Sequence, residues 1–188
     1  MNDGVTITNC YSTANVTAFG QQVGGLVGTT TSRLTMSDCF AAGDVYSATS
    51  GAGGIVGRVQ RSSSIVNCIA WNKNVASSRS ANNVYASGAI LGCAQEQGTY
   101  KGCIRRADMV YADDFLTLVD HEDCENACPP LPSYSTATHQ QAYHGKAAAA
   151  GASLASVAKS LGWDESVWDF SSDSGLSIKG LGDNKIEF

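Results

Sequence analysis

Cysteines are the residues of this 188-residue sequence whose chemistry and spacing are most informative. Thiols can form disulfides, bind soft metals or act as nucleophiles. Four of them recur at matching positions of a repeat: Cys10, Cys39, Cys68 and Cys103. A disulfide scaffold is one interpretation if the protein is exported. Equivalent residues on stacked parallel strands, however, point in the same direction, which suits packing better than bridging. We therefore expect these thiols to form a structural ladder of small, buried apolar groups.

A second set of possible ligands lies in the C-terminal half of the chain. Cys124 and Cys128 flank a predicted turn and could either bridge locally or stay free. A metal site can be drawn from these two cysteines with His121 and either His139 or His144, but the spacing matches no strong zinc template. A cysteine and a histidine could also form a nucleophilic pair, but only if the fold brought them together. We therefore predict no metal, no cofactor and no catalytic residue.

Several carboxylates lie in the same region, and oxygen ligands of this kind suit calcium. They are Asp113, Asp114, Asp120, Glu122 and Asp123. Their order lacks the regular spacing of a calcium-binding loop. We interpret them as solvated loop carboxylates.

A glycine-rich pentapeptide precedes each of the last three repeat cysteines. It reads GGLVG at 24–28, GGIVG at 53–57 and GAILG at 88–92. The step from the closing glycine to the next cysteine has the same length in all three copies, from 28 to 39, from 57 to 68 and from 92 to 103. The step from a cysteine to the next closing glycine is equal in the first two copies, from 10 to 28 and from 39 to 57, and six longer in the last, from 68 to 92. The sequence therefore predicts a repeat of about 29 residues with one six-residue insertion, which stacked solenoids tolerate because each unit touches only its neighbours.

The residues around the cysteines predict strands and corners. An apolar row lies three positions before the cysteines, and a turn-prone row lies directly before them. The first row is Ile7, Met36, Ile65 and Tyr100, and the second is Asn9, Asp38, Asn67 and Gly102. Because Asn, Asp and Gly adopt left-handed conformations cheaply, the second row marks a corner between two strands. A third strand begins at each of the later valines, Val16, Val45 and Val75.

Three strands per repeat predict an all-β fold, a right-handed parallel β-helix with about 29 residues per coil. Stacked apolar rows would build its core layer by layer. In the pentapeptides, the rows Leu26/Ile55/Ile90 and Val27/Val56/Leu91 are both apolar, so the sequence does not decide which of them faces the core. A strand that is apolar on both faces is usually covered on both.

The insertion falls in a polar stretch around residues 77–83, which is typical of an exposed loop. Trp71 and Tyr85 flank this loop. Loops on a rigid scaffold often carry recognition, although a tolerated bulge without a role is the more common outcome.

The bulk composition excludes some partners. The chain has 12 basic and 17 acidic residues, a net charge of −5 and no basic stripe, so we expect no nucleic-acid binding. No apolar run approaches the roughly 18 residues that a membrane helix requires. The first residues do not resemble a signal peptide, and the sequence begins inside a repeat. We expect the chain to be the C-terminal part of a longer exported protein, with upstream domains as partners.

The repeat pattern changes near residue 105, which predicts two domains, the β-helix repeats at 1–115 and a C-terminal cap at 116–188. Residues 154–161 have apolar side chains at helical spacing, with Ser153 as N-cap and Gly162 in the C-cap position. Three aromatic residues follow, and residues 176–181 could form a last strand. The aromatic residues are Trp163, Trp168 and Phe170. The open end of a β-helix exposes unpaired strand edges, and we expect residues 116–188 to cover that end.

The pentapeptides, the Asn/Asp-Cys-Tyr/Phe corners and the Asn/Asp-Val steps that follow resemble the GLUG-motif repeat. The resemblance covers about residues 5–104, and the ending at 161–170 also looks like that of such arrays. The third copy departs from the pattern at 88–92 and 101–104. GLUG repeats occur in surface proteins of gut bacteria and in some bacterial immunoglobulin A peptidases, outside the catalytic machinery. The resemblance implies an extracellular or surface-anchored, adhesin-like protein.

Our first functional hypothesis is a non-catalytic adhesin-like or structural module. The row directly after the cysteines points outward if the cysteines point inward, and a column of large apolar groups must then be covered by the cap, an upstream domain or a partner. This row is Tyr11, Phe40, Ile69 and Ile104. Together with the loop, it predicts a surface for a host protein or a carbohydrate. The residues of that surface would be Tyr11, Phe40, Trp71 and Tyr85.

The alternative hypothesis is a polysaccharide-cleaving β-helix, either a lyase or a glycosidase. Such an enzyme needs paired acids, or a calcium site with Arg or Lys, on one face. Asp38 and Asp44 instead lie at predicted corners without a basic residue at matching positions. The sequence therefore favours the module.

Overall fold

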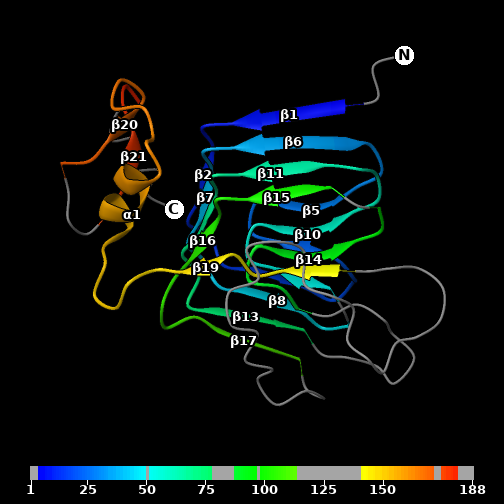
Figure 1. The fold of residues 1–188 in the computed structure, drawn as a ribbon. Helices are drawn as coiled ribbons and strands as arrows, with labels where there is room; N and C mark the ends of the chain where they lie inside the picture. Colours follow the sequence, from blue (N-terminus) through cyan, green and yellow to red (C-terminus); the bar gives the residue numbers. More distant parts are fainter. Residues whose placement is uncertain are drawn as a thin grey trace.

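The structure, a computed structural model, describes residues 4–49, 51–77, 87–96, 98–113, 141–171 and 175–181. Within them the fold is all-β with one short helix, and most of the sheets are parallel (Figure 1). No helix in these ranges is long and apolar enough to cross a membrane.

The chain passes through the same sheets in the same order several times, and each passage is called a round below. Round one contains β1 (Gly4–Thr8), β2 (Tyr11–Ser12), β3 (Val16–Ala18), β4 (Val23–Gly24) and β5 (Val27–Thr30). Round two contains β6 (Arg33–Ser37), β7 (Phe40–Ala41), β8 (Val45–Ser47), β9 (Ala52–Gly53) and β10 (Val56–Val59). Round three contains β11 (Ser64–Val66), β12 (Ile69–Ala70), β13 (Asn74–Ser77) and β14 (Leu91–Ala94). Round four contains β15 (Thr99–Lys101), β16 (Ile104–Arg105) and β17 (Val110–Asp113).

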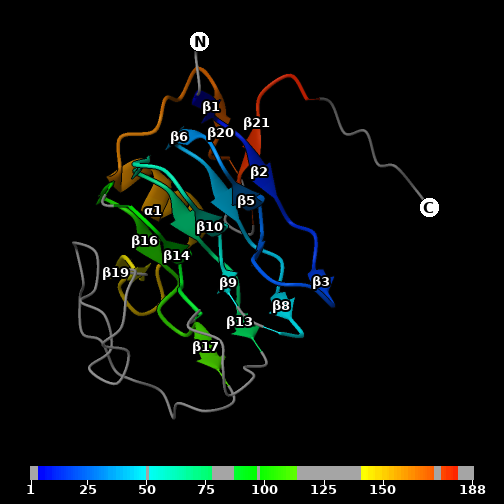
Figure 2. The same cartoon turned by 90° about the vertical axis from the view of Figure 1, so that its right-hand side faces the viewer.

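Strands from successive rounds lie side by side (Figures 1 and 2). The four larger sheets have the orders β1-β6-β11-β15, β5-β10-β14-β18, β3-β8-β13-β17 and β2-β7-β12-β16-β19. We call the last of these the lateral sheet. Two later strands extend the sheets: β18 (Gln141–Tyr143) pairs antiparallel with β14 of round three, and β19 (Lys146–Ala147) pairs parallel with β16 of round four. A small sheet of β4 and β9 completes the round.

The register follows the predicted repeat. Ile7 pairs with Met36 and Met36 with Ile65, at the same offset of 29 that separates Cys10 from Cys39. The offset becomes 30 at Val45 and Val75, and 35 at the bridge between Gly53 and Gly88. One extra residue therefore lies between β12 and Val75, and five lie between β13 and Gly88. The predicted loop falls mostly on residues 78–86, which are outside the described ranges.

The predicted corners are confirmed. All four residues that precede the repeat cysteines have left-handed backbones, with φ of 52° at Asn9, 54° at Asp38, 51° at Asn67 and 65° at Gly102. Asn and Asp tolerate this region better than other side chains, and Gly occupies it freely. The row therefore sets the direction in which each round turns into the lateral sheet.

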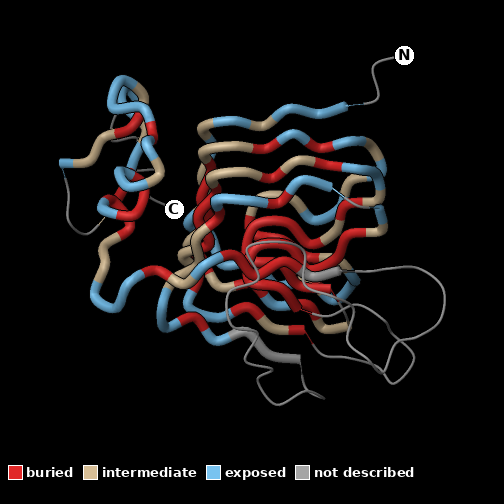
Figure 3. Tube along the Cα trace, in the orientation of Figure 1, coloured by how far each residue is buried: buried red, intermediate tan, exposed pale blue. Residues whose placement is uncertain are grey.

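The core has two parts. They lie on opposite faces of the lateral sheet, because successive side chains of a strand point to opposite faces. The interior cluster lies inside the rounds and contains the apolar rows and three of the four repeat cysteines. Both pentapeptide rows belong to it, so the choice that the sequence left open resolves to both: Ile55, Ile90, Val56 and Leu91 are fully buried, with Leu26 and Val27 packed at the margin. Figure 3 shows this buried band running through the stacked rounds. Each fully buried large apolar side chain contributes about 1.5–3 kcal/mol.

The lateral cluster lies on the outer face of the lateral sheet. Phe40 and Ile69 point outward there, as predicted, while Cys39 and Cys68 belong to the interior cluster. The C-terminal residues that cover them are Leu154, Val157, Ala158, Trp163, Trp168 and Leu176.

The C-terminal segment contains α1 (Leu154–Ser160), β20 (Trp168–Asp169) and β21 (Ser177–Ile178). The hydroxyl of Ser153 accepts the amide N–H of Ser156 at 3.2 Å, which confirms the predicted N-cap. The C-cap is Leu161, so Gly162 lies one residue beyond the predicted position, at φ 75°. The amides of Gly162 and Trp163 donate to the carbonyls of Lys159 and Ala158, which closes the helix in the manner of a glycine-terminated Schellman motif.

The position of this segment corrects our expectation of an end cap. The helix and the β20–β21 hairpin lie against the outer face of the lateral sheet, beside the rounds (Figure 1). Among the described residues after round four, β18 and β19 are the strands that pair with an end of the stack. The physical reason is that the large apolar side chains of the row after the cysteines must be kept from water. The edge of a sheet needs only hydrogen-bond partners for its backbone, and two short strands can supply them. The predicted boundary at 115/116 borders residues outside the described ranges, and the division into domains stays a prediction.

Candidate functional site

The candidate site is built on the residues that directly follow the strands of the lateral sheet. These equivalent positions form one row across the four rounds, the cleft row: Thr13, Ala42, Trp71 and Arg106. Backbone hydrogen bonds hold the row in register: the amides of Ala42, Trp71 and Arg106 donate to the previous round at 2.9, 2.7 and 2.8 Å. Because stacked strands are about 4.8 Å apart, neighbouring side chains of the row lie in contact range.

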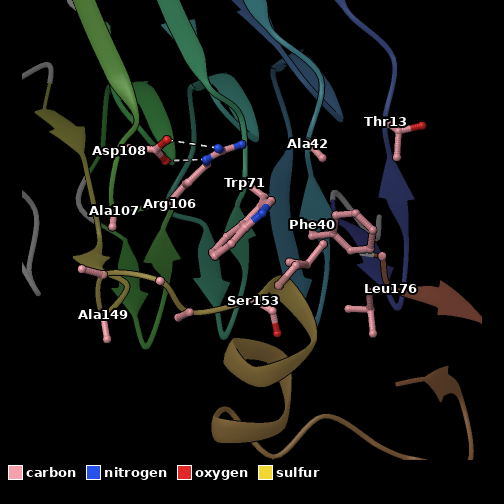
Figure 4. A pocket seen from close by; sticks show the side chains of 15 residues that line it. Thr13, Phe40, Ala42, Trp71, Arg106, Ala107, Asp108, Ala149, Ser153 and Leu176 are labelled. Carbon is pink, nitrogen blue, oxygen red and sulfur yellow. Dashed lines mark hydrogen bonds and ion pairs between the residues drawn. The ribbon is translucent and has the colours of Figure 1, made fainter. Parts of the chain in front are cut away.

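A cleft of about 670 Å³ lies between the cleft row and the C-terminal segment (Figure 4). Residues 149–154, Gly175 and Leu176 form its opposite wall, and Phe40 also lines it. Alanine and glycine dominate that wall, so the polar chemistry comes mainly from the cleft row and from Asp108. A volume of this size falls within the usual range for small-molecule sites.

Trp71 lies at the centre of the cleft in Figure 4. The extra residue of round three follows it directly, and Asn72 turns inward and is fully buried. The side-chain amide of Asn72 donates to the carbonyl of Gly43 in the round before. This buried hydrogen bond fixes the backbone next to Trp71, whose half-buried indole also packs against the lateral cluster.

Arg106 and Asp108 supply the charged groups of the cleft. The guanidinium donates to both carboxylate oxygens, from Nε to Oδ1 and from Nη2 to Oδ2, the latter at 3.1 Å. The hydrogen bonds from Arg106 lower the pKa of Asp108, which keeps this carboxylate ionised. The two side chains are 33% and 62% exposed, so the pair faces solvent as a planar, net neutral group.

Tyr11 and Phe40 do not form an open ligand surface, which corrects that part of our hypothesis. Phe40 is only 1% exposed, and its ring stacks on Tyr11 with centroids 5.0 Å apart. Trp168 packs on both rings, at 5.8 Å from Phe40 and 6.2 Å from Tyr11. We had considered the cap, an upstream domain or a partner as the cover of this row. In the structure, the C-terminal segment covers it.

Two hydrogen bonds anchor the aromatic cover to the corners. Trp163 Nε1 donates to the carbonyl of Asn67 at 3.0 Å, and Trp168 Nε1 donates to Asn9 Oδ1 at 3.2 Å. The cover therefore connects rounds one and three.

The predicted cysteine ladder is present in rounds two to four, where Cys39, Cys68 and Cys103 are buried free thiols. Each donates to the carbonyl two residues before it, as Cys39 does to Ser37 at 3.0 Å. Cys10 is exposed, contrary to our expectation, because no described strand stacks on the outer side of round one. Burial raises the pKa of Cys68 well above its usual value, whereas a hydrogen bond from Cys68 lowers the pKa of Cys39.

Cys93 is a further buried thiol, which our repeat alignment did not single out. It lies on β14 in the third round and is 1% exposed. Burial raises its pKa to about 12. Like the buried thiols of the ladder, it is packed in the interior, and its raised pKa keeps it protonated at neutral pH.

Most of the remaining candidates lie outside the described residues, namely Tyr85, His121, Cys124, Cys128, His139 and all but one of the clustered acids. His144 is described and buried, and its Nδ1 accepts the amide of Ala89 at 3.1 Å. Within the described ranges, no three His, Cys, Asp or Glu side chains are grouped closely enough to hold a metal ion.

Asp38 and Asp44 have structural surroundings. Asp38 holds a left-handed corner. The carboxylate of Asp44 accepts the backbone amide and the side-chain amide of Asn74, at 2.9 and 2.8 Å, and these hydrogen bonds lower its pKa. Asp38 therefore forms part of a turn, and Asp44 links round two to round three.

Sequence reasoning found Trp71 but missed Arg106 and Asp108. The signal was available, because every residue of the cleft row lies three positions after a repeat cysteine. The row was hidden by its mixed chemistry, Thr, Ala, Trp and Arg, whereas our alignment followed rows of one residue type. The opposite wall of the cleft depends on where the C-terminal segment docks, which the repeat does not specify.

Comparisons with known proteins support the fold. No family model matches the chain, and no curated protein matches it. Its fold is similar to that of a "putative immunoglobulin A1 protease" from Bacteroides ovatus, solved by crystallography, with a TM-score of 0.68 and 24% sequence identity. The match covers 93% of this chain and 48% of that one, so the chain spans about half the length of that protein.

Proposed function

We propose that this chain is a non-catalytic, adhesin-like binding module of an exported bacterial surface protein. Its rounds would form a right-handed parallel β-helix of GLUG-type repeats, a finer description that the recurring motif and the parallel in-register strands support. The likeness of the fold to a protein described as an immunoglobulin A1 protease fits the resemblance to repeats found in such peptidases. Upstream domains of a longer chain, and a carbohydrate or a host protein, are its proposed partners.

The observation that carries the proposal is the contrast between the cleft and the rest of the stack. Outside the cleft, the polar residues that we had considered for chemistry have structural surroundings: Asp38 forms a corner, Asp44 accepts from Asn74 of the next round, and the buried thiol of Cys39 donates to a backbone carbonyl. The cleft instead combines an aromatic side chain, an exposed ion pair and small walls. Ligand sites on rigid scaffolds commonly combine an apolar or aromatic lining with a few placed polar groups.

The alternative, a polysaccharide-cleaving enzyme, needs two carboxylates flanking one bond or an acid with a metal. Asp108 is the sole carboxylate among the described residues that line the cleft, and it is engaged by Arg106. An acid held ionised in this way is a poor proton donor at neutral pH. The arrangement therefore favours binding without cleavage.

The test is to incubate the chain with immobilised mucin and with a panel of polysaccharides. We expect retention of the protein on at least one ligand and no new reducing ends. Release of products by the wild type that is lost in Asp108→Asn would support the enzyme instead. The same loss in Asp38→Asn or Asp44→Asn, with unchanged folding by circular dichroism, would also overturn the proposal.

A further inference from the structure

We propose that the cleft binds one pyranose ring of a neutral saccharide, stacked on Trp71 and hydrogen-bonded by Arg106 and Asp108. The inference rests on the proposed binding function and specifies its site and its ligand class. Three properties of the cleft lead to it: a flat apolar platform, a polar group that both donates and accepts, and the absence of net charge among its described lining residues.

The platform is the indole of Trp71. In the cleft row its neighbours are Ala42 in round two and Arg106 in round four. Because Ala42 ends at Cβ, the row leaves room beside the indole that a larger side chain would fill. The C–H groups on one face of a pyranose form an apolar surface, which can stack on an aromatic ring. Trp163 and Trp168 are 4% and 0% exposed, so they are not available as platforms.

The ion pair supplies the polar complement. Arg106 uses Nε and one Nη2 hydrogen on Asp108, which leaves the remaining guanidinium N–H groups to donate. Each carboxylate oxygen of Asp108 keeps a lone pair that can accept. Neighbouring hydroxyl groups of a sugar both donate and accept, so a vicinal diol can bridge the two side chains. Figure 4 shows the pair beside Trp71, on the side of the cleft away from Phe40.

Charge decides between neutral and acidic saccharides. The carboxylate and the guanidinium cancel one another, and the other described lining residues carry no charge. A uronic acid would have to compete with Asp108 for the guanidinium, and it would bring a second carboxylate close to the first. The cleft therefore favours a ligand without charge.

The experiment follows tryptophan fluorescence of the whole chain during titration with neutral tetrasaccharides of glucose, mannose and galactose, and with tetragalacturonate. We expect a saturable change with at least one neutral tetrasaccharide, and a weaker response or none with tetragalacturonate. Trp71→Ala should lower the affinity, measured by calorimetry, by about tenfold, the effect of losing one aromatic contact. Trp71→Phe should keep most of the affinity, and Asp108→Asn should lower it.

The matched control is Phe19→Ala, because Phe19 is 90% exposed and does not line the cleft. This variant should bind as the wild type does. Unfolding curves for each variant confirm that a loss of binding is not a loss of fold. If Trp71→Ala does not fold, Trp71→Phe together with Asp108→Asn carries the test.

The possible failures are distinguishable. If the chain binds glycans and Trp71→Ala binds them equally well, the binding function stands and the cleft assignment is wrong. If tetragalacturonate binds more tightly than every neutral tetrasaccharide, the ligand class is wrong. If neither the tetrasaccharides nor the immobilised mucin and polysaccharides are bound, both proposals fail.

Discussion

Rounds one and three of the stack carry the same kinds of residues in the same rows, yet they are buried to different extents. Ile7 and Ile65 share a row, and Cys10 and Cys68 share another. Ile65 and Cys68 are fully buried, whereas Ile7 is partly exposed and Cys10 is exposed. The residue types of a row therefore determine the conformation of each round. The burial of a side chain depends in addition on whether a neighbouring round stacks on each side.

The outer edge of round one is unusual in a second way. The sequence contains no Asp, Glu, Lys or Arg from residue 4 to residue 32, and no proline. Natural proteins commonly protect sheet edges with charges, prolines or bulges. Round two, by contrast, has Arg33 on β6 and Arg58 on β10. Round one is therefore chemically suited to pair with a further strand.

The largest expected difference between the rounds is in thiol reactivity. Iodoacetamide should alkylate Cys10 of the folded chain at least about 100-fold faster than Cys39, Cys68 or Cys103, because a buried thiol reacts only after local opening. The thiolate is the reactive species, so raising the pH from about 7 to about 9 should accelerate Cys10 strongly. Burial raises the pKa of Cys68, so that site should stay slow over the same range. Peptide-level mass spectrometry measures each site.

Denaturant provides the control, since unfolding should bring the repeat cysteines to similar rates. Equal rates in the folded chain, or a disulfide between two of the repeat cysteines, would contradict the ladder as described.

The next difference is in packing energy, and the matched pair is Ile65→Ala and Ile7→Ala. Ile65 is fully buried, and its truncation should lower the free energy of unfolding by about 2–5 kcal/mol, as other large-to-small changes in cores do. Ile7 occupies the same row at the edge, where the same change should cost about 1 kcal/mol or less. Urea denaturation followed by circular dichroism measures both. Similar losses would mean that something in solution covers round one.

The repeat geometry could be predicted from the sequence because it depends on local residue types at fixed spacing. The register between rounds, the left-handed corners and the outward apolar row after the cysteines all follow from positions relative to the cysteines. The helix is similar, since Ser153 and the glycine after the C-cap act within a few residues. In each case the physical cause lies inside one turn or one strand.

The placement of the C-terminal segment could not be predicted, because it depends on contacts distant in sequence. Trp168 reaches Asn9, 159 residues earlier, and Trp163 reaches Asn67, 96 residues earlier. No spacing rule encodes such pairs. The same holds for the cleft. The cleft row follows from the repeat, but the opposite wall forms only where residues 149–154 of the C-terminal segment pack.

The smallest expected difference concerns the corners, and it tests whether a neighbour on both sides also fixes the backbone. Asn67 has φ 51°, where an alanine costs about 1–2 kcal/mol and a glycine costs nothing sterically. Asn67→Ala and Asn67→Gly remove the same amide group. The difference between their unfolding free energies therefore approximates the left-handed strain, with glycine's own entropy as a smaller correction of opposite sign.

The same pair of substitutions at Asn9 completes the comparison. Both remove the acceptor of Trp168 Nε1, so this loss cancels in the difference between Asn9→Ala and Asn9→Gly. Rounds two and four hold the corner at Asn67 in place, whereas the corner at Asn9 has a described round on one side only. It can relax toward a less strained φ, so its alanine–glycine difference in urea denaturation should be the smaller one. An equal difference at the two corners would show that each turn is held by its own residues, independently of the stack.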